Sequence, residues 1–192
     1  MNGGATDNMS ATDRAGAADR VNASHPTSPS LSGVHSRLPS LGRRGEGWAI
    51  LQVVLLAAIV ATGLVATAWP VAARLPLAIA AGLLAVGGAW LFVGGITGLG
   101  RQLTPFPRPV AQGSVRRRGA YRLVRHPMYG GALLLVLAWA LISSPFALLP
   151  WAVAAVFLDI KRRREESWLL ERYGEYAAYT QQVRRRFVPG AW

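Results

Sequence analysis

The sequence predicts an all-α integral membrane protein with about four transmembrane helices, the last two forming a short helical hairpin, followed by a cytoplasmic C-terminal helix. Apolar residues make up 52% of the 192-residue chain and charged residues only 16%. The apolar residues lie in long blocks, which is typical of membrane spans rather than of a soluble core. The net charge of +12 comes from arginines that flank these blocks. This placement indicates cytoplasmic ends of membrane helices and contact with membrane lipids rather than nucleic-acid binding.

Composition excludes several kinds of site. The chain has no cysteine, so disulfides, cysteine-ligated metals and cysteine nucleophiles are all excluded. Two of its three histidines, His25 and His35, fall in a polar segment, and we therefore expect no metal site. The sequence also lacks a glycine-rich phosphate loop and a dinucleotide-binding fingerprint.

The chain divides into a tail, residues 1–42, and a membrane domain, residues 43–192. The tail is rich in Ser, Ala, Gly, Asp, Thr and Pro and has no sustained apolar period, so we expect it to be disordered. Arg43-Arg44 precedes an apolar run, as in a twin-arginine signal. However, the run at 48–69 exceeds the apolar core of a signal peptide and predicts a first span.

A second span is predicted at 77–99, after a connector at Pro70–Pro76. It is rich in small residues, which let membrane helices approach closely. The predicted packing residues are Ala81, Ala85, Ala89, Gly94 and Gly98. The next connector, Arg101–Arg125, is basic and can contact anionic lipid headgroups. Its prolines in 104–109 exclude a helix there.

The apolar stretch 128–158 is too long for one span and too short for two full ones. Ser143-Ser144-Pro145 near its centre indicates a helix stop followed by a restart, which predicts spans at about 128–143 and 145–160. One long kinked helix is the alternative, and it would place the C-terminus on the opposite side.

Charge favours the hairpin. The clusters Arg116–Arg118, Arg162–Arg164 and Arg184–Arg186 lie on one side of the membrane only if the chain turns back. We therefore predict that both termini lie in the cytoplasm and that the protein is located in the plasma (inner) membrane.

Residues 118–131 combine cationic and aromatic side chains with one imidazole. Pro127 has no backbone N–H and a fixed φ, so it predicts a helix that begins there, with His126 at the boundary. A helix start crowded by Arg118, Arg122 and Arg125 would attract an anionic group. Alternatively, these arginines only mark the cytoplasmic side.

Beyond Lys161 the sequence is polar but still typical of a helix. Helical spacing would place four residues on one face, which are Leu169, Tyr173, Tyr176 and Thr180. An interfacial amphipathic helix is the alternative interpretation. The hairpin would bring Glu165-Glu166 close to His126. Arginines, an imidazole, tyrosines and two carboxylates together suit a ligand with both anionic and cationic parts.

Two motifs in this order resemble the isoprenylcysteine carboxyl methyltransferase and phospholipid methyltransferase superfamily. The first is Arg125-His-Pro-Met-Tyr-Gly130, preceded by Gly119-Ala-Tyr-Arg122. The second comprises Glu165-Glu166, Leu169, Tyr173-Gly174 and Tyr176-Ala-Ala-Tyr179, and it is followed by Arg186-Phe-Val-Pro189. One departure is Val183-Arg-Arg-Arg-Phe187, which lacks a proline that the family often has.

The resemblance implies binding of S-adenosylmethionine at the cytoplasmic membrane face and methyl transfer to a lipophilic acceptor, either an isoprenylcysteine-type carboxylate or a phospholipid amine. It implies no metal. The residues that it assigns to the cofactor site are Tyr121, Arg125, His126, Pro127, Tyr129, Gly130, Glu165, Glu166 and Tyr176. Glu166 and His126 are the candidate catalytic residues, because a protonated amine acceptor needs a base whereas a carboxylate does not.

Two other functions remain compatible with the sequence. Some membrane reductases carry a similar Arg-His-Pro-x-Tyr region and use NADPH. The chain could also be a non-enzymatic membrane protein whose basic surface binds lipids.

Overall fold

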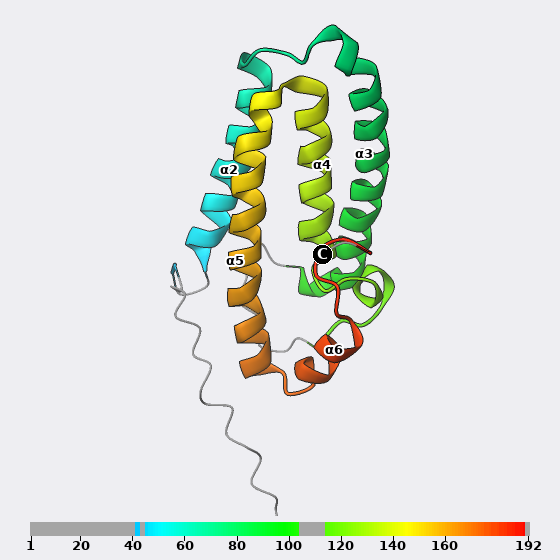
Figure 1. Ribbon diagram of the computed structural model, residues 1–192. Helices are drawn as coiled ribbons and strands as arrows, with labels where there is room; N and C mark the ends of the chain where they lie inside the picture. The colour runs from blue at the N-terminus through cyan, green and yellow to red at the C-terminus, as the bar shows by residue number, and fades with distance from the viewer. Residues whose placement is uncertain (1–40, 43–44, 104–113, 191–192) are drawn as a thin grey trace, which may run out of the picture. The chain divides into compact units, whose positions relative to one another are not determined.

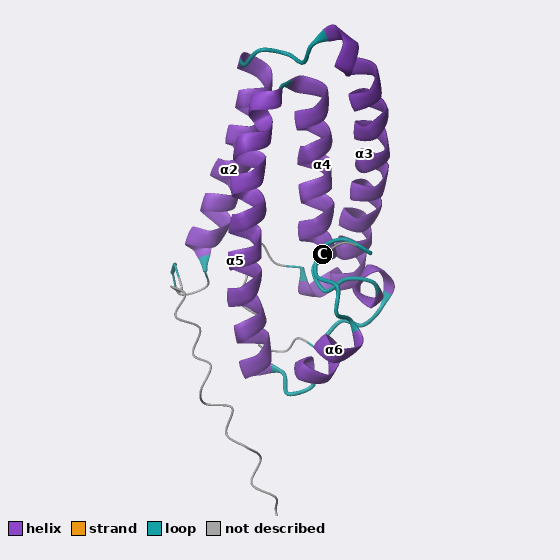
Figure 2. Ribbon diagram, in the orientation of Figure 1, coloured by secondary structure: helices purple, strands orange, loops and turns teal. Residues whose placement is uncertain are grey.

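The described part of the chain consists of helices joined by loops (Figure 2). The computed structural model describes residues 41–42, 45–103 and 114–190, all within one unit, Ser36–Trp192. No strand occurs among these residues, in agreement with the all-α prediction. The elements are α2 (Glu46–Val65), α3 (Val71–Leu99), η1 (Gly100–Gln102), η2 (Gly119–Arg122), α4 (Pro127–Ser143), η3 (Pro145–Ala147), α5 (Leu148–Arg172) and α6 (Tyr176–Gln182). The predictions for residues 1–40 and for the prolines at 104–109 lie outside the described residues.

Two helices, α2 and α3, are long and apolar enough to cross a membrane, with 20 and 29 residues. α4 is apolar but shorter, and α5 is apolar only in its first half. Many large apolar side chains on these helices are exposed, among them Leu64, Leu83 and Leu149. Exposed large apolar side chains of this kind suit contact with lipid.

The first two helices differ from their predicted limits. α3 begins at Val71, six residues earlier than expected, and includes Pro76. Pro76 is the sixth residue of α3 and lacks the N–H that would bond to the carbonyl of Ala72, a residue that is exposed. α2 ends at Val65, so Trp69 lies in the connector. Its indole N–H donates to the Ala140 carbonyl (3.1 Å) and ties this connector to α4.

α4 and α5 form a helical hairpin (Figure 1). Ser144 is extended (φ −155°, ψ 141°), and its Oγ accepts a hydrogen bond from the Phe146 N–H. The same hydroxyl donates to the Thr67 carbonyl (2.7 Å), so the α2–α3 connector lies beside the hairpin turn. The start of α4 and the second half of α5 carry most of the predicted site residues. These two segments therefore lie close together at the other end of the hairpin.

Glycines bring α3 and α4 into close contact. A Cβ on Gly88 would lie 3.0 Å from the Gly131 carbonyl oxygen, and one on Gly131 would lie 2.6 Å from the Gly88 carbonyl oxygen. A Cβ on Gly95 would lie 2.5 Å from Met128 Cγ. Only residues without a side chain permit backbones to approach this closely.

The predicted small-residue stripe on α3 is partly wrong. Ala81 is buried, but Ala89 is exposed. The buried positions are Ala81, Gly88, Leu91 and Gly95, which follow the seven-residue repeat of two helices that cross at a small angle. Gly94 and Gly98 do pack closely, but against Ala120 and Tyr121 of η2 rather than against another membrane helix.

The predicted aromatic face beyond Lys161 does not exist as a single helix face. α5 continues to Arg172, Tyr173 is extended (φ −123°, ψ 102°), and the separate helix α6 begins at Tyr176. Gly174 follows directly and favours a break in the helix. Leu169 and Tyr176 therefore belong to different helices, which lets α6 turn back toward η2.

Candidate active site

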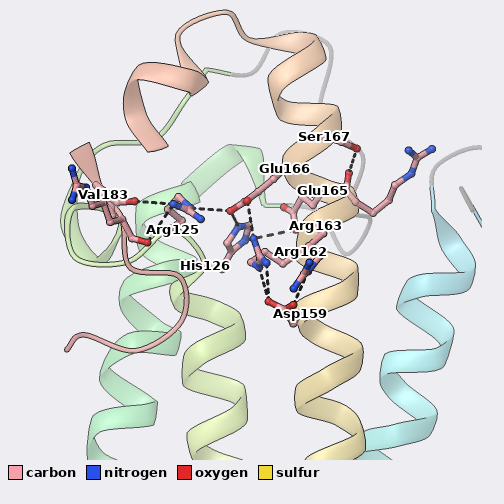
Figure 3. A network of polar contacts seen from close by, with 11 residues as sticks. Arg125, His126, Asp159, Arg162, Arg163, Glu165, Glu166, Ser167 and Val183 are labelled. Carbon is pink, nitrogen blue, oxygen red and sulfur yellow. Dashed lines mark hydrogen bonds and ion pairs between the residues drawn. The ribbon is translucent and has the colours of Figure 1, made fainter. Parts of the chain in front are cut away.

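The candidate site lies at the end of the hairpin away from Ser144 and combines three segments (Figure 3). These are residues 119–130 before and within the start of α4, residues 159–166 of α5, and residues 183–188, which we call the C-terminal strap. Nearly all of the predicted site residues come from the first two segments, and the structure brings these together.

The start of α4 agrees with its prediction. His126 is the N-cap residue (φ −128°, ψ 63°) and Pro127 is the first helical residue. The backbone N–H groups of Arg125 and His126 donate to the carbonyls of Arg185 (3.0 Å) and Arg186 (2.9 Å) in the strap. The strap thereby fixes the entry of the chain into α4.

Gly130 is required by the strap. A Cβ at this position would lie only 1.9 Å from the Phe187 carbonyl oxygen, so no larger residue fits without displacing backbone. Phe187 is completely buried. Its ring lies edge-on to the rings of His126 (centroids 6.2 Å apart) and Tyr129 (6.4 Å) and so holds both side chains in place.

Glu166 lies at the centre of the charge network. Its Oε1 accepts a hydrogen bond from Arg125 Nε (2.8 Å) and lies 2.9 Å from His126 Nε2, while its Oε2 accepts from Arg162 Nη1 (2.8 Å). Burial alone would raise the pKa of Glu166, but the hydrogen bond from His126 and the charges of His126, Arg125 and Arg162 lower that pKa to about 2. Glu166 is therefore ionised at neutral pH, and both of its oxygens have partners.

Glu165 differs from its neighbour. Its Oε2 accepts a hydrogen bond from the Tyr129 hydroxyl (2.8 Å), and His126 Nδ1 lies 3.9 Å away. Its Oε1 has no hydrogen bond to any described residue. The imidazole of His126 stacks on the Tyr129 ring, with the planes only 4° apart. Both oxygens of Glu166 thus have hydrogen-bond partners, whereas one oxygen of Glu165 has none among the described residues.

Three buried tyrosines line the side of the site near α6. The Tyr179 hydroxyl donates to the Tyr121 carbonyl (2.7 Å). Burial raises the pKa values of the Tyr121 and Tyr176 phenols. The charge of Glu165 raises the pKa of Tyr121 further, and the charge of Glu166 raises that of Tyr176 further. Both phenols therefore stay protonated. Within the described residues, neither of these two hydroxyls has a hydrogen-bond partner, so each can donate one to a ligand.

The three arginines near α4 differ in their surroundings. Arg118 and Arg122 are exposed and do not join the network. Arg125 does, but its guanidinium is used by Glu166 and by the Val183 carbonyl (3.1 Å). It therefore holds α5 and the strap together through Nε and Nη1, while Nη2 has no hydrogen bond to a described residue.

Sequence reasoning missed Arg162 and Asp159. Arg162 is only 4% exposed and donates to Asp159 Oδ1 through Nε (3.0 Å) and Nη2 (2.7 Å) as well as to Glu166. The spacing Asp159, Arg162, Glu166 is i, i+3 and i+7 on one helix, which places the three charges on one face. That spacing could have identified the network, but Arg162–Arg164 was interpreted only as a topology signal.

Comparison with known proteins gives one family. The sequence model of the family described as phospholipid methyltransferase matches residues 77–176, slightly more than half of the chain. No curated protein matches the chain. The matched range contains most of α3, the whole α4–α5 hairpin and both halves of the charge network, but not the strap.

Proposed function

The chain belongs to the phospholipid methyltransferase family, and we propose that it transfers the methyl group of S-adenosylmethionine to a lipophilic acceptor at the cytoplasmic face of the plasma (inner) membrane. The family is one of methyltransferases that act on lipid-like substrates. The cofactor, the acceptor and the membrane face are parts of our proposal.

The observation that carries the proposal is the pairing of the two motifs. Tyr129 and His126 of the first contact Glu165 and Glu166 of the second at 2.8 and 2.9 Å. Near this pair, the charge of Glu165 acts on the phenols of both Tyr121 and Tyr176, and neither phenol has a hydrogen bond to a described residue.

These free groups fit S-adenosylmethionine. Its ammonium and hydroxyl groups need acceptors such as the Glu165 carboxylate, and its positively charged sulfur is stabilised by a nearby negative charge and by aromatic faces. We propose that Glu165, Tyr121 and Tyr176 contact the cofactor directly. Arg125, His126, Pro127, Tyr129, Gly130 and Glu166 would build and position that site.

This assignment refines the candidate catalytic residues. The oxygens of Glu166 are already bound by Arg125, His126 and Arg162, and its pKa is low, so it is a poor proton acceptor. We propose that Glu166 positions His126 and Arg125. His126 keeps its Nδ1 near Glu165 Oε2 (3.9 Å) and is the better candidate for a base.

When bound, S-adenosylmethionine would supply an electrophilic methyl group on sulfur. The protein would then contribute chiefly by holding the reactants in line and by excluding water, through the buried rings of Tyr176 and Phe187 and the partly buried ring of Tyr129. A carboxylate acceptor would attack without losing a proton. A protonated amine would first pass its proton to a base.

We also propose four membrane spans, with both termini cytoplasmic, made by α2, α3, α4 and the first half of α5. α4 would rise only about 26 Å at 1.5 Å per residue, close to the hydrocarbon thickness. Contacts between the segments that carry Arg116–Arg118 and Arg184–Arg186 support a location of both clusters on the same side of the membrane. Arg117 Nη2 donates a hydrogen bond to the Glu175 carbonyl (3.1 Å), and the backbone N–H of Arg125 donates one to the Arg185 carbonyl.

Binding of S-adenosylmethionine to the purified full-length protein in detergent, measured by calorimetry, tests the cofactor assignment. We expect binding by the wild-type protein and a loss of at least about tenfold in Glu165→Gln, from removal of a charged hydrogen-bond partner. Glu171→Gln is the matched control, because Glu171 is an exposed carboxylate on the same helix. Heat from NADPH but none from S-adenosylmethionine would contradict the proposal and indicate a reductase.

Methyl transfer itself can be followed with isotope-labelled S-adenosylmethionine and a membrane lipid extract. We expect label in a lipid fraction with the wild-type protein and none with Glu165→Gln. Label that base releases as volatile methanol would identify a carboxylate acceptor, since methyl esters hydrolyse to methanol whereas methyl groups on amines stay attached to nitrogen. Binding without any transfer to lipid would restrict the protein to a non-enzymatic role.

A further inference from the structure

Lys161 is a buried cation that the proposed function does not use. It is the only lysine in the sequence, it lies one helical turn before Glu165 on α5, and it is 2% exposed. Its Nζ donates a hydrogen bond to the neutral amide oxygen of Gln52 on α2. Among the described residues, no carboxylate forms an ion pair with it. A charge taken out of water is costly unless an opposite charge lies nearby, so Lys161 needs a counter-charge.

The other buried Lys or Arg side chain of the described residues, Arg162, is already compensated. It binds Asp159 Oδ1 (2.7 Å) and Glu166 Oε2 (2.8 Å). Arg125 Nε binds the second oxygen of Glu166 (2.8 Å). Two guanidinium groups and two carboxylates therefore balance one another, and Lys161 takes no part in that balance.

Glu165 is the carboxylate that the same balance leaves out. Its Oε2 accepts a hydrogen bond from the neutral hydroxyl of Tyr129 (2.8 Å), and its closest ionisable nitrogen is His126 Nδ1, at 3.9 Å. Burial lowers the pKa of Lys161, whereas the charge of Glu165 raises it. Lys161 and Glu165 are thus two opposite charges that act on each other without a direct bond.

Tyr129 holds both of these charges. Lys161 Nζ lies 5.2 Å from the centre of the Tyr129 ring, and the hydroxyl of the same ring donates to Glu165. A cation over an aromatic face is attracted by the ring. The ammonium is therefore held at the face and the carboxylate at the hydroxyl. Glu165 Oε1 keeps no hydrogen bond to a described residue, although a compensating cation lies close by.

We propose that Lys161 is the resident counter-charge of Glu165 and that it limits how strongly the site prefers S-adenosylmethionine to its demethylated product, S-adenosylhomocysteine. This inference rests on the proposed function and makes Lys161 a specificity-determining residue of the same site. When the methyl group passes to the acceptor, the electron pair of the broken carbon–sulfur bond stays on sulfur, which becomes neutral. The two ligands therefore differ by one positive charge. Glu165 favours the cationic ligand, and Lys161 opposes that preference because like charges repel.

Calorimetry on the purified full-length protein in detergent tests the proposal. The measured quantity is the dissociation constant of S-adenosylhomocysteine divided by that of S-adenosylmethionine. We expect this ratio to rise at least about fivefold in Lys161→Met, because the attraction of Glu165 for the sulfonium is then unopposed. Sinefungin, which carries a protonated amine where S-adenosylmethionine carries its methylsulfonium, should gain affinity relative to S-adenosylhomocysteine in the same variant.

Matched variants separate charge from packing. Lys161→Arg keeps the charge and should keep the wild-type ratio. Arg172→Met removes an exposed cation from the same helix and should keep the ratio as well. Lys161→Met leaves the Gln52 amide oxygen without its partner, which lowers stability. The double variant Lys161→Met, Gln52→Leu removes both partners at once, so it retains the fold and should show the same rise in the ratio.

Two results would overturn the inference. The first is an unchanged or lower ratio in both Lys161→Met and the double variant. A purely structural role of Lys161 gives that result, because damage to the site weakens the binding of both ligands alike. The second is an equal rise in Lys161→Arg, which excludes charge as the cause. Normal binding of S-adenosylmethionine together with either result rejects this inference alone, whereas failure of the wild-type protein to bind S-adenosylmethionine rejects the proposed function.

Discussion

His126 and Glu166 are forty residues apart in the sequence, yet His126 Nε2 lies 2.9 Å from Glu166 Oε1. The two residues sit on the two arms of the α4–α5 hairpin, near its open end (Figure 3). Their distance therefore depends on how the arms pack and on the groups that bind Glu166. Substitutions that alter either should change the site, and they lead to four predictions.

Arg162 and Arg163 provide a test of the network. Their side chains are 5% and 62% exposed, and both bind Asp159, but only Arg162 reaches Glu166. We expect Arg162→Met to cost about 3 kcal/mol, because it leaves buried carboxylate oxygens without a partner. Arg163→Met should cost less than about 1 kcal/mol. Melting temperatures in detergent measure this difference, and equal shifts in both variants would contradict the central role of Arg162.

Gly130→Ala should displace the C-terminal strap. The added Cβ would overlap the Phe187 carbonyl oxygen, which we expect to cost about 1–3 kcal/mol and to lower ligand affinity. Gly82→Ala is the control, since a Cβ at Gly82 meets nothing within 4 Å. Limited proteolysis of the strap, followed by mass spectrometry, would detect its release. A strap that stays protected in Gly130→Ala would show that the contact is dispensable.

Glu166 should make stability sensitive to acid. Its pKa falls from an ordinary value of 4.5 to about 2 on folding, so the unfolded chain binds the proton more tightly. The resulting stabilisation, about 3 kcal/mol, is complete above pH 4.5 and is lost as the pH falls toward 2. The measurement is the stability difference between wild type and Glu166→Gln at a series of pH values. It should be constant from pH 7 to about 5 and then shrink; a difference that does not change down to pH 2.5 would argue against the shift.

Adjacent glycines on α3 should respond very differently to a large side chain. Gly88 packs against Gly131 and Leu134 of α4, whereas a Cβ on Gly87 meets nothing within 4 Å. Gly88→Leu should separate the helices and destabilise the protein by at least about 1–3 kcal/mol. Gly87→Leu should be nearly neutral. Thermal unfolding of the two variants in the same detergent makes the comparison, and similar melting temperatures would indicate that α3 and α4 do not pack as described.

Much of the fold could be predicted from local signals. Pro127 and Ser144-Pro145 constrain the backbone directly, and the helix start and the hairpin turn lie where these residues predict them. The start of α3 was misplaced because residues 71–76 were assigned to a connector, whereas they form the first turns of the helix and include Pro76.

The candidate site was less predictable, because its details depend on contacts between distant segments. The motifs identified Glu165 and Glu166 as a pair, but only the packing distinguishes the carboxylate with occupied oxygens from the one with a free oxygen. Lys161 was likewise indistinguishable from a membrane-flanking cation. Its burial against Gln52, 109 residues away, has no local sequence signal.

The strap also orders events during synthesis. Residues 183–188 are translated after both arms of the hairpin, yet their carbonyls bind the N–H groups of Arg125 and His126 at the start of α4. The helices can therefore enter the bilayer before the site exists. We therefore expect the proposed site to be complete only after the strap has left the ribosome and folded back, so that membrane insertion and competence to bind a ligand would be separated in time.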